Sequence, residues 1–92
     1  MIQSFSCSHT RDLFNGKRVA RFANFEFVAQ RKLAMLNAAL DLWDLRSPPG
    51  NRLEMLTGDR AGQASIRINA QWRVCFRWTA NGPADVEIID YH

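Results

Sequence analysis

The chain has 92 residues, of which 47% are hydrophobic, and a formal net charge of +3 at pH 7. This apolar share is too high for a disordered chain, and the length predicts a single domain over residues 1–92 with one core. No segment has the roughly 20 apolar residues that a membrane-spanning helix needs, and Met1–Cys7 does not resemble a signal peptide, so we expect a cytoplasmic protein without membrane contact.

The first part of the chain predicts a short strand and a short helix. Met1–Ser6 alternates apolar and polar residues, which indicates a strand. Ser8 is the expected N-cap of a helix over His9–Asn15, and Gly16 is the expected stop of that helix. A basic connector over residues 17–21 follows.

A longer helix is predicted from Phe25 to about Trp43. Asn24 is its expected N-cap, and the prolines within Ser47–Gly50 exclude its continuation. Apolar residues recur at steps of three and four, which is typical of a helix that buries one face in the core. This apolar stripe consists of Phe25, Val28, Ala29, Leu33, Leu36, Ala39, Leu40 and Trp43.

Beyond the prolines, the apolar period changes from 3.6 residues to 2, which predicts strands. The segments are Leu53–Leu56, Ser65–Asn69, Trp72–Trp78 and Val86–Tyr91, and turn-rich sequence separates them. Helices followed by hairpin-linked strands predict an α+β fold, in which the N-terminal helices pack on one face of a small antiparallel sheet.

Alternation along the Trp72–Trp78 strand assigns its side chains to two faces. Trp72 and every second residue after it lie toward the helices, whereas Arg73, Cys75 and Arg77 lie on the opposite face. With Arg67 on the neighbouring strand, this second face is predicted to be open and basic. A guanidinium binds phosphate oxygens through two parallel hydrogen bonds, so the face is a candidate phosphate-binding surface; a merely solvated sheet face is the alternative.

The sequence closes on Asp90, Tyr91 and His92. If Val86 and Ile88 face the helices, Tyr91 lies on the arginine face. When the ribose 2′-hydroxyl of RNA attacks its own phosphate, the enzyme must accept one proton, return another and neutralise the developing charge. Arginine can neutralise the charge, and histidine, tyrosine or a carboxylate can carry out the two proton transfers. The ends of chains, however, are more often frayed and without function.

The cysteines and histidines do not predict a metal site. Cys7 and Cys75 lie far apart, and neither they nor His9 and His92 have the spacing of zinc ligands. We therefore expect no metal and no cofactor.

Several motifs together carry a resemblance to a known family. They occur in order over nearly the whole chain: Met1–Phe5, Leu45–Leu53 (LRSPPGNRL), Gly58–Gly62 (GDRAG), Ser65–Asn69 (SIRIN), Gln71–Phe76 (QWRVCF) and Val86–His92 (VEIIDYH). On these motifs the sequence resembles the HigB group of toxins in the RelE/ParE superfamily, and above all the HigB/GraT toxins of pseudomonads.

The resemblance implies a RelE-like fold and the toxin of a type II toxin-antitoxin system. Toxins of this group are endoribonucleases that cut mRNA on the ribosome, which inhibits translation and growth. They pair with a helix-turn-helix antitoxin of the HigA/GraA kind and contact operator DNA only through that complex. By matching position, the resemblance implies that Arg73 stabilises the phosphate and that Asp90, Tyr91 and His92 form the catalytic group.

One departure from the family pattern lies before the Gly-Asp-Arg loop. Some relatives have a histidine and a lysine where this chain has Glu54 and Thr57. The loss of a basic residue at position 57 removes a second phosphate contact that the resemblance implies. It predicts either a less potent toxin or a substitute contact from Arg52 or Arg60, and the sequence is compatible with both. The predicted RNA-binding set comprises Arg52, Arg60, Arg67 and Arg77.

Two other functions fit parts of the sequence. A gyrase-inhibiting toxin of the ParE kind shares the fold but does not need the Asp90-Tyr91-His92 ending. A non-catalytic RNA- or protein-binding module that acts with a regulatory partner needs only the fold and the basic face. An assay for cleavage of translated mRNA separates these hypotheses.

Overall fold

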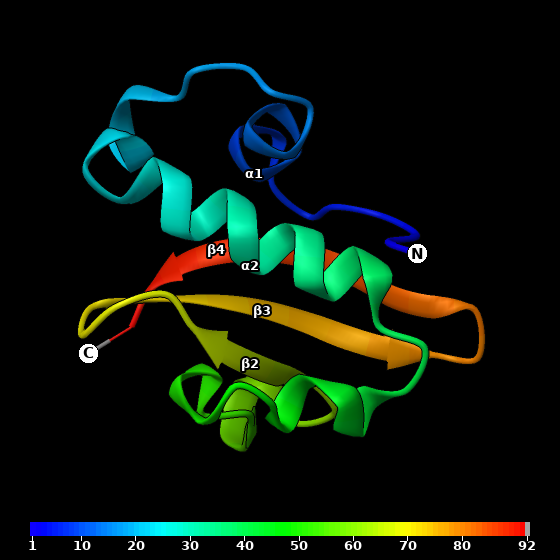
Figure 1. Cartoon of the computed structure of the whole chain (residues 1–92). Coiled ribbons are helices and arrows are strands. Elements are labelled where there is room, and N and C mark those ends of the chain that lie inside the picture. The colour runs from blue at the N-terminus through cyan, green and yellow to red at the C-terminus, as the bar shows by residue number, and fades with distance from the viewer. Residues whose placement is uncertain (92) are drawn as a thin grey trace.

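Helices cover one face of a four-stranded antiparallel sheet in the computed structural model of the chain (Figure 1). The structure describes residues 1–91, so His92 lies outside the described residues. Neighbouring strands in the sheet are also neighbours in sequence, and they are β1 (Glu54–Met55), β2 (Ala64–Arg67), β3 (Trp72–Thr79) and β4 (Gly82–Asp90). The predicted α+β class is confirmed.

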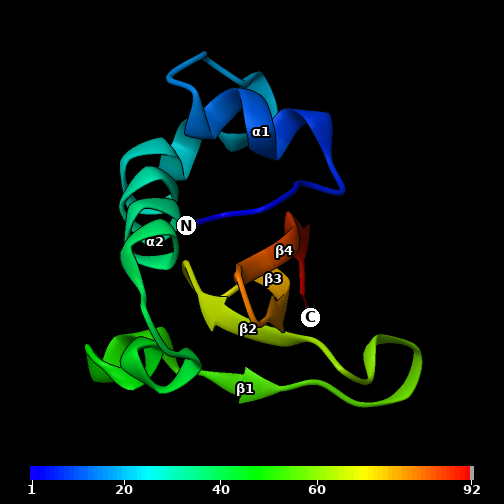
Figure 2. The ribbon, with the colours of Figure 1, turned by 90° about the vertical axis from the view of Figure 1, so that its right-hand side faces the viewer.

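Two α-helices and four short 3-10 helices make up the rest of the regular structure. The α-helices are α1 (Ser8–Phe14) and α2 (Glu26–Ala38), and the 3-10 helices are η1 (Ala20–Phe25), η2 (Leu42–Arg46), η3 (Pro49–Asn51) and η4 (Gly58–Arg60). Figure 2 shows α2 along one side of the sheet, and the loop after β1 extends beyond the other side. Within residues 1–91, no helix is long and apolar enough to cross a membrane.

The core lies between α2 and the helix-facing side of the sheet. Leu33 and Leu36 of α2 are fully buried, as the apolar stripe predicts. The alternating apolar residues of the strands pack against them, which confirms the predicted face of β3 and β4; they include Ile66, Val74, Phe76, Val86 and Ile88. The apolar residues that recur every 3.6 residues in the helix and every 2 residues in the strands therefore form one core.

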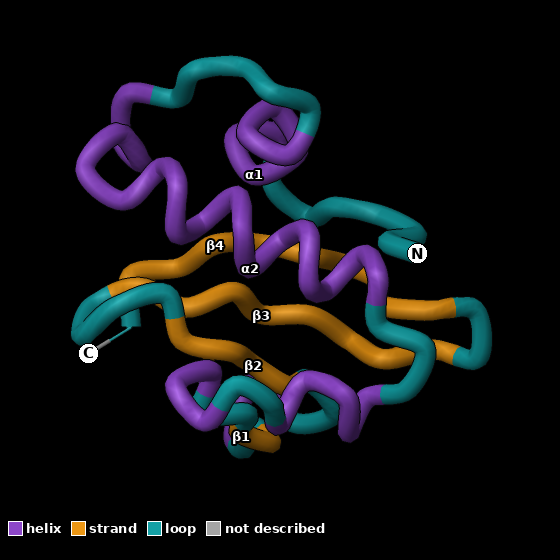
Figure 3. The backbone as a smooth tube through the Cα atoms, in the orientation of Figure 1, coloured by secondary structure: helices purple, strands orange, loops and turns teal. Residues whose placement is uncertain are grey.

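The segment before α1 runs beside β4 (Figure 3) but is not a strand. Phe5 pairs with Val86 in a single parallel bridge. The backbone N–H of Ile2 donates instead to the side-chain oxygen of Asn37 on α2, 2.9 Å away. The predicted strand at Met1–Ser6 is therefore wrong, because the segment divides its hydrogen bonds between the sheet and a helix.

Two predicted helix caps are also wrong. Ser8 is the first residue of α1, and the extended residue before that helix is Cys7. Asn24 lies inside η1, and Phe25 precedes α2. Because η1 leads directly into α2, Asn24 is not in the extended conformation that a side-chain cap requires. Gly16, with φ at +89°, lies just beyond the end of α1 and stops this helix as predicted.

The second helix ends well before the predicted position at Trp43. Ala39 is already extended, with ψ at 132°. The Asp41 side chain accepts a hydrogen bond from the backbone of Trp43, and the Asp44 side chain accepts one from the backbone of Asp41. These two aspartates form a capping box that starts η2, so local side-chain bonds replace the helical bonds that the apolar stripe predicted.

Two leucines of the apolar stripe can test where α2 ends. Leu36 is fully buried, whereas Leu40 is 93% exposed. We expect Leu36→Ala to lower the free energy of unfolding by roughly 2–5 kcal/mol, because it removes buried contacts and leaves a cavity. Leu40→Ala should change it by less than about 0.5 kcal/mol. Urea denaturation measures both, and equal losses would show that the helix continues through Leu40 into the core.

Candidate functional site

Arg73 on β3 is buried rather than displayed on an open surface. It is only 8% exposed, and Cys75 on the same strand is fully buried. The predicted open basic face is therefore wrong at the centre of the sheet. The reason is that chain segments outside the strands approach this face, since the backbone of Arg52 and the ring of Tyr91 both lie against the Arg73 guanidinium.

Neutral oxygens hold the Arg73 guanidinium in place. Its Nε donates to the Ser65 hydroxyl at 2.7 Å, and its Nη2 donates to the Arg52 carbonyl at 2.5 Å. Within the described chain, no carboxylate lies within ion-pair distance of it. These residues orient the buried guanidinium but do not neutralise it. Its positive charge therefore remains available to bind an anionic ligand.

A second arginine lies directly beside Arg73. Arg67 on β2 is its cross-strand partner in the sheet register. Like charges in directly opposite positions destabilise a sheet, so this pair suits an anion that lies between or over the two side chains. With Arg52, both line a pocket of about 260 Å³, whose walls consist of Arg52, Arg67, Asn69, Ala70, Arg73 and Tyr91. We call it the arginine pocket.

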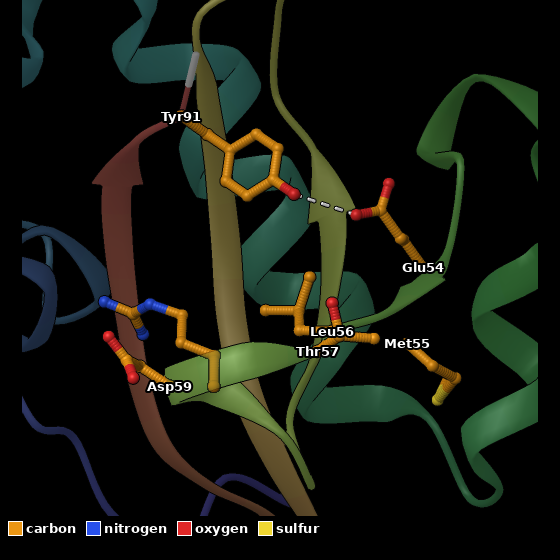
Figure 4. A pocket seen from close by; sticks show the side chains of 7 residues that line it. Glu54, Met55, Leu56, Thr57, Asp59 and Tyr91 are labelled. Carbon is orange, nitrogen blue, oxygen red and sulfur yellow. Dashed lines mark hydrogen bonds between the residues drawn. The ribbon is translucent and has the colours of Figure 1, made fainter.

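Tyr91 separates the arginine pocket from a second one. This neighbouring pocket, of about 190 Å³, is lined by Glu54, Met55, Leu56, Thr57, Asp59, Arg60 and Tyr91. Because two carboxylates lie in its wall, we call it the acidic pocket. Figure 4 shows the Tyr91 hydroxyl directed at the Glu54 carboxylate, to which it donates a hydrogen bond of 2.9 Å.

The environment of Tyr91 determines which proton transfer it can perform. The hydrogen bond to Glu54 raises the pKa of the Tyr91 phenol, and the negative charge of Glu54 raises it further. Arg73, whose guanidinium carbon lies 5.6 Å from the centre of the Tyr91 ring, acts in the opposite direction. Since the net effect is a raised pKa, the phenol is protonated at neutral pH and can donate a proton but not accept one.

Two of the predicted RNA-binding arginines lie in ion pairs. Arg60 contacts Glu87 on β4 at 2.9 Å, and Arg77 contacts Asp85 on β4 at 3.1 Å. Arg60 also lines the acidic pocket, whereas Arg77 lines neither pocket. Their carboxylate partners reduce the charge that they present to a phosphate, unlike Arg52, Arg67 and Arg73.

The structure separates the predicted C-terminal group. Tyr91 lies between the two pockets, but Asp90 accepts a hydrogen bond from the Gln71 side chain in the β2–β3 turn at 3.0 Å. The backbone carbonyl of Gln71 also accepts the Tyr91 N–H. Asp90 thus ties the end of β4 to the turn beside the site. The predicted role of His92 concerns a residue outside the described part of the chain.

No nucleophilic thiol or clustered metal ligands accompany the site in the part of the chain that the structure describes. Burial raises the pKa of the Cys75 thiol to about 11, so this side chain remains a neutral thiol. Residues 1–91 contain no group of three or more histidine, cysteine, aspartate or glutamate side chains that could hold a metal ion.

The groups that orient Arg73 were not among those predicted from the sequence. Strand alternation could have found Ser65, because it lies two residues from Arg67 and therefore on the same face. The Arg52 carbonyl gives no such signal, since a backbone oxygen has no counterpart in side-chain patterns. Glu54 was treated only as a departure from a family pattern, yet its carboxylate is the partner of Tyr91.

A family model and one of two similar proteins point to the same family. Residues 12–92 match the family model described as a RelE-like toxin of the type II toxin-antitoxin system HigB. Toxin HigB-1 of Vibrio cholerae serotype O1 is 48% identical over 62 residues, which cover 67% of this chain and 64% of that protein. An uncharacterized protein of Haemophilus influenzae is 41% identical over 59 residues, or 64% of this chain and 58% of that protein. The matched regions span less than two thirds of either relative.

The contact between Tyr91 and Glu54 can be tested without any substrate. Tyr91 is the only tyrosine in the chain, so the ultraviolet absorbance of tyrosinate reports on it alone. Glu54→Gln removes the negative charge that opposes ionisation, and we expect the pKa of Tyr91 to fall toward its ordinary value.

Asp59→Asn is the matched control, because Asp59 lines the same pocket but the Tyr91 hydroxyl donates to Glu54. It should leave the tyrosine titration close to that of the native protein. A pKa for Tyr91 that is the same in the native protein and in Glu54→Gln would contradict the contact.

Proposed function

The chain belongs to the HigB-like family of RelE-type toxins from type II toxin-antitoxin systems, and from this premise we propose that it is a ribosome-dependent endoribonuclease that cleaves mRNA. One observation carries the proposal: the Arg73 guanidinium is buried, oriented by Ser65 and the Arg52 carbonyl, and has no carboxylate partner among residues 1–91. Such a group is suited to charge that develops on a phosphate during reaction.

The proposed reaction is an internal transfer at phosphorus. The ribose 2′-hydroxyl oxygen forms a bond to the adjacent phosphorus, and the bond from phosphorus to the 5′-oxygen of the next nucleotide breaks. The products are a cyclic phosphate and a 5′-hydroxyl end. In the arginine pocket, Arg73 neutralises the charge of the transition state, while Arg52 and Arg67 bind the same or a neighbouring phosphate.

The two proton transfers are assigned to the wall between the pockets. Tyr91, with its raised pKa, donates a proton or a hydrogen bond toward the departing 5′-oxygen. The Glu54 carboxylate, which accepts the Tyr91 hydrogen bond in this structure, is the proposed acceptor for the proton of the 2′-hydroxyl. Asp90 holds the end of β4 through Gln71, and His92 remains a predicted member of the catalytic group.

The partners follow from the same proposal. As a toxin of a type II system, the chain has an antitoxin partner. We propose that this antitoxin is of the helix-turn-helix kind, that the complex rather than the toxin alone contacts operator DNA, and that the toxin acts on ribosomes in the cytoplasm. The excess positive charge of the chain favours association with an acidic surface on the antitoxin and with RNA.

The proposal predicts a large loss of cleavage when Arg73 is replaced. Arg73→Ala should reduce the rate of mRNA cleavage on translating ribosomes by on the order of 100- to 1000-fold, because it removes a donor that acts in the transition state. Arg73→Lys retains the charge but not the planar fork, and should recover only part of the rate. Cleavage is measured with purified protein and mapped at the ends of the mRNA fragments.

The matched control is Arg11→Ala, which removes an exposed arginine on α1. It should cleave at the native rate, and circular dichroism should show that each variant is folded. A folded Arg73→Ala variant with native activity would refute the assigned role of Arg73. A native protein that leaves translated mRNA intact but inhibits DNA supercoiling by gyrase would replace the proposed function with the ParE-like alternative.

A further inference from the structure

A fully buried asparagine lies directly before the residue whose carbonyl holds Arg73. Asn51 is 0% exposed. Its amide nitrogen donates to the carbonyls of Leu45 at 3.1 Å and Ser47 at 3.3 Å. One side chain thus closes the loop between the end of η2 and the start of β1. The bond to Leu45 satisfies a buried backbone oxygen.

A buried lysine fixes Asn51 to α2. Lys32 is 9% exposed, and its Nζ donates to the Asn51 side-chain oxygen at 2.5 Å. In the described part of the chain, no carboxylate forms an ion pair with this ammonium. Burial and the neighbouring charge of Arg31 lower the pKa of Lys32, which shows that the surroundings disfavour its charged form.

The loop that these two residues fix delivers the Arg52 carbonyl to the site. Arg52 follows Asn51 and adopts the left-handed conformation, with φ at +46° and ψ at 55°. This conformation is unfavourable for a residue other than glycine, so the surrounding contacts must hold it. This turn directs its carbonyl at Arg73 Nη2 and places Arg52 in the wall of the arginine pocket. A chain of contacts therefore runs from α2, through Lys32 and Asn51, to the guanidinium.

We propose that Asn51 and Lys32 are positioning residues for Arg73: they hold the Arg52 carbonyl where it fixes the orientation of the guanidinium toward the bound phosphate. The role rests on the proposed cleavage of RNA, since the guanidinium acts there on the phosphate. The arrangement has a cost, because a buried ammonium without a carboxylate is unfavourable, and its hydrogen bond to Asn51 is the contact that it supplies in return.

The first test measures cleavage rates under single-turnover conditions. Asn51→Ala should lower the rate constant at saturating ribosome complex by on the order of 10- to 100-fold, because a displacement of about 1 Å at a reacting group has effects of this size. The half-saturating concentration should rise by a smaller factor than the rate constant falls, since Arg67 remains in place and only the loop that carries Arg52 moves. In an Arg73→Ala background, Asn51→Ala should cause no further loss, because residues that act through one another are not additive.

Lys32→Met is the second variant, and it keeps the proposal testable if Asn51→Ala does not fold. Methionine fills the space of the lysine stem and removes the buried charge, but it leaves the Asn51 side-chain oxygen without this donor. Cleavage should slow in the folded variant, and the melting temperature is measured beside the rate so that rates are compared below the unfolding transition. The matched controls are Asn37→Ala, which removes another asparagine contact of α2, and Arg31→Met, which removes the adjacent exposed charge. Both controls should cleave like the native protein.

A second measurement does not depend on activity. Arg73 lowers the pKa of Tyr91, so a guanidinium that moves away from the ring should raise the pKa of the single tyrosine. We expect this rise in Asn51→Ala, and in Lys32→Met, but not in Asn37→Ala. The measurement uses absorbance titration of the folded variants, with Arg73→Ala as the reference for complete loss of the effect.

The two measurements distinguish the inference from the proposed function. If the native protein does not cleave mRNA but Asn51→Ala raises the pKa of Tyr91, the function is wrong and the positioning of Arg73 stands. If the native protein cleaves mRNA and folded Asn51→Ala and Lys32→Met retain both the native rate and the native tyrosine titration, the positioning role is overturned. A loss of rate that persists equally in the Arg73→Ala background overturns it as well.

Discussion

The burial of one guanidinium constrains the structure around the site. Arg73 lies inside the sheet face, where an unsatisfied donor would be destabilising, so its surroundings must supply acceptors. They do so with neutral oxygens, namely the hydroxyl and the backbone carbonyl of Ser65 on β2 and the backbone carbonyl of Arg52. The last of these acceptors requires the chain before β1 to approach the sheet in an unusual conformation, and the contacts of Asn51 maintain it. The orientation of the site thus depends on the turn that joins η3 to β1.

The fold was predictable wherever one physical effect dominated. Strand alternation predicted which residues of β3 face α2, because a shift of one residue would expose Val74 and Phe76 to water. The end of α2 was not predictable from the same kind of pattern. The apolar stripe extends past Ala38, but the hydrogen bonds of Asp41 and Asp44 are strong enough to end the helix and leave Leu40 exposed. Local polar contacts prevailed there over a continuing apolar period.

The composition of the site was predictable only in part. Alternation predicted that Arg67, Arg73 and Tyr91 share a face, and the register of the sheet brings them together. It could not predict which arginines pair with acids. The β3–β4 register is irregular between Cys75 and Arg77, and a bulge of this kind changes which β4 residue each β3 residue meets. The contact of Arg77 with Asp85 follows from that register, and no periodic pattern in a single strand contains it.

The charges on the two sides of Tyr91 determine how the site would respond to a phosphate. Glu54 raises the pKa of the phenol, and Arg73 opposes this effect. An anion bound to Arg73 compensates the guanidinium charge and weakens its ability to stabilise tyrosinate. On the proposed function, binding of RNA would therefore raise the pKa of Tyr91 further, and the phenol would retain its proton until the leaving oxygen develops negative charge. In the proposed reaction Tyr91 is therefore the proton donor, and the proton of the 2′-hydroxyl needs a different acceptor, for which we propose Glu54, the residue that accepts the Tyr91 hydrogen bond.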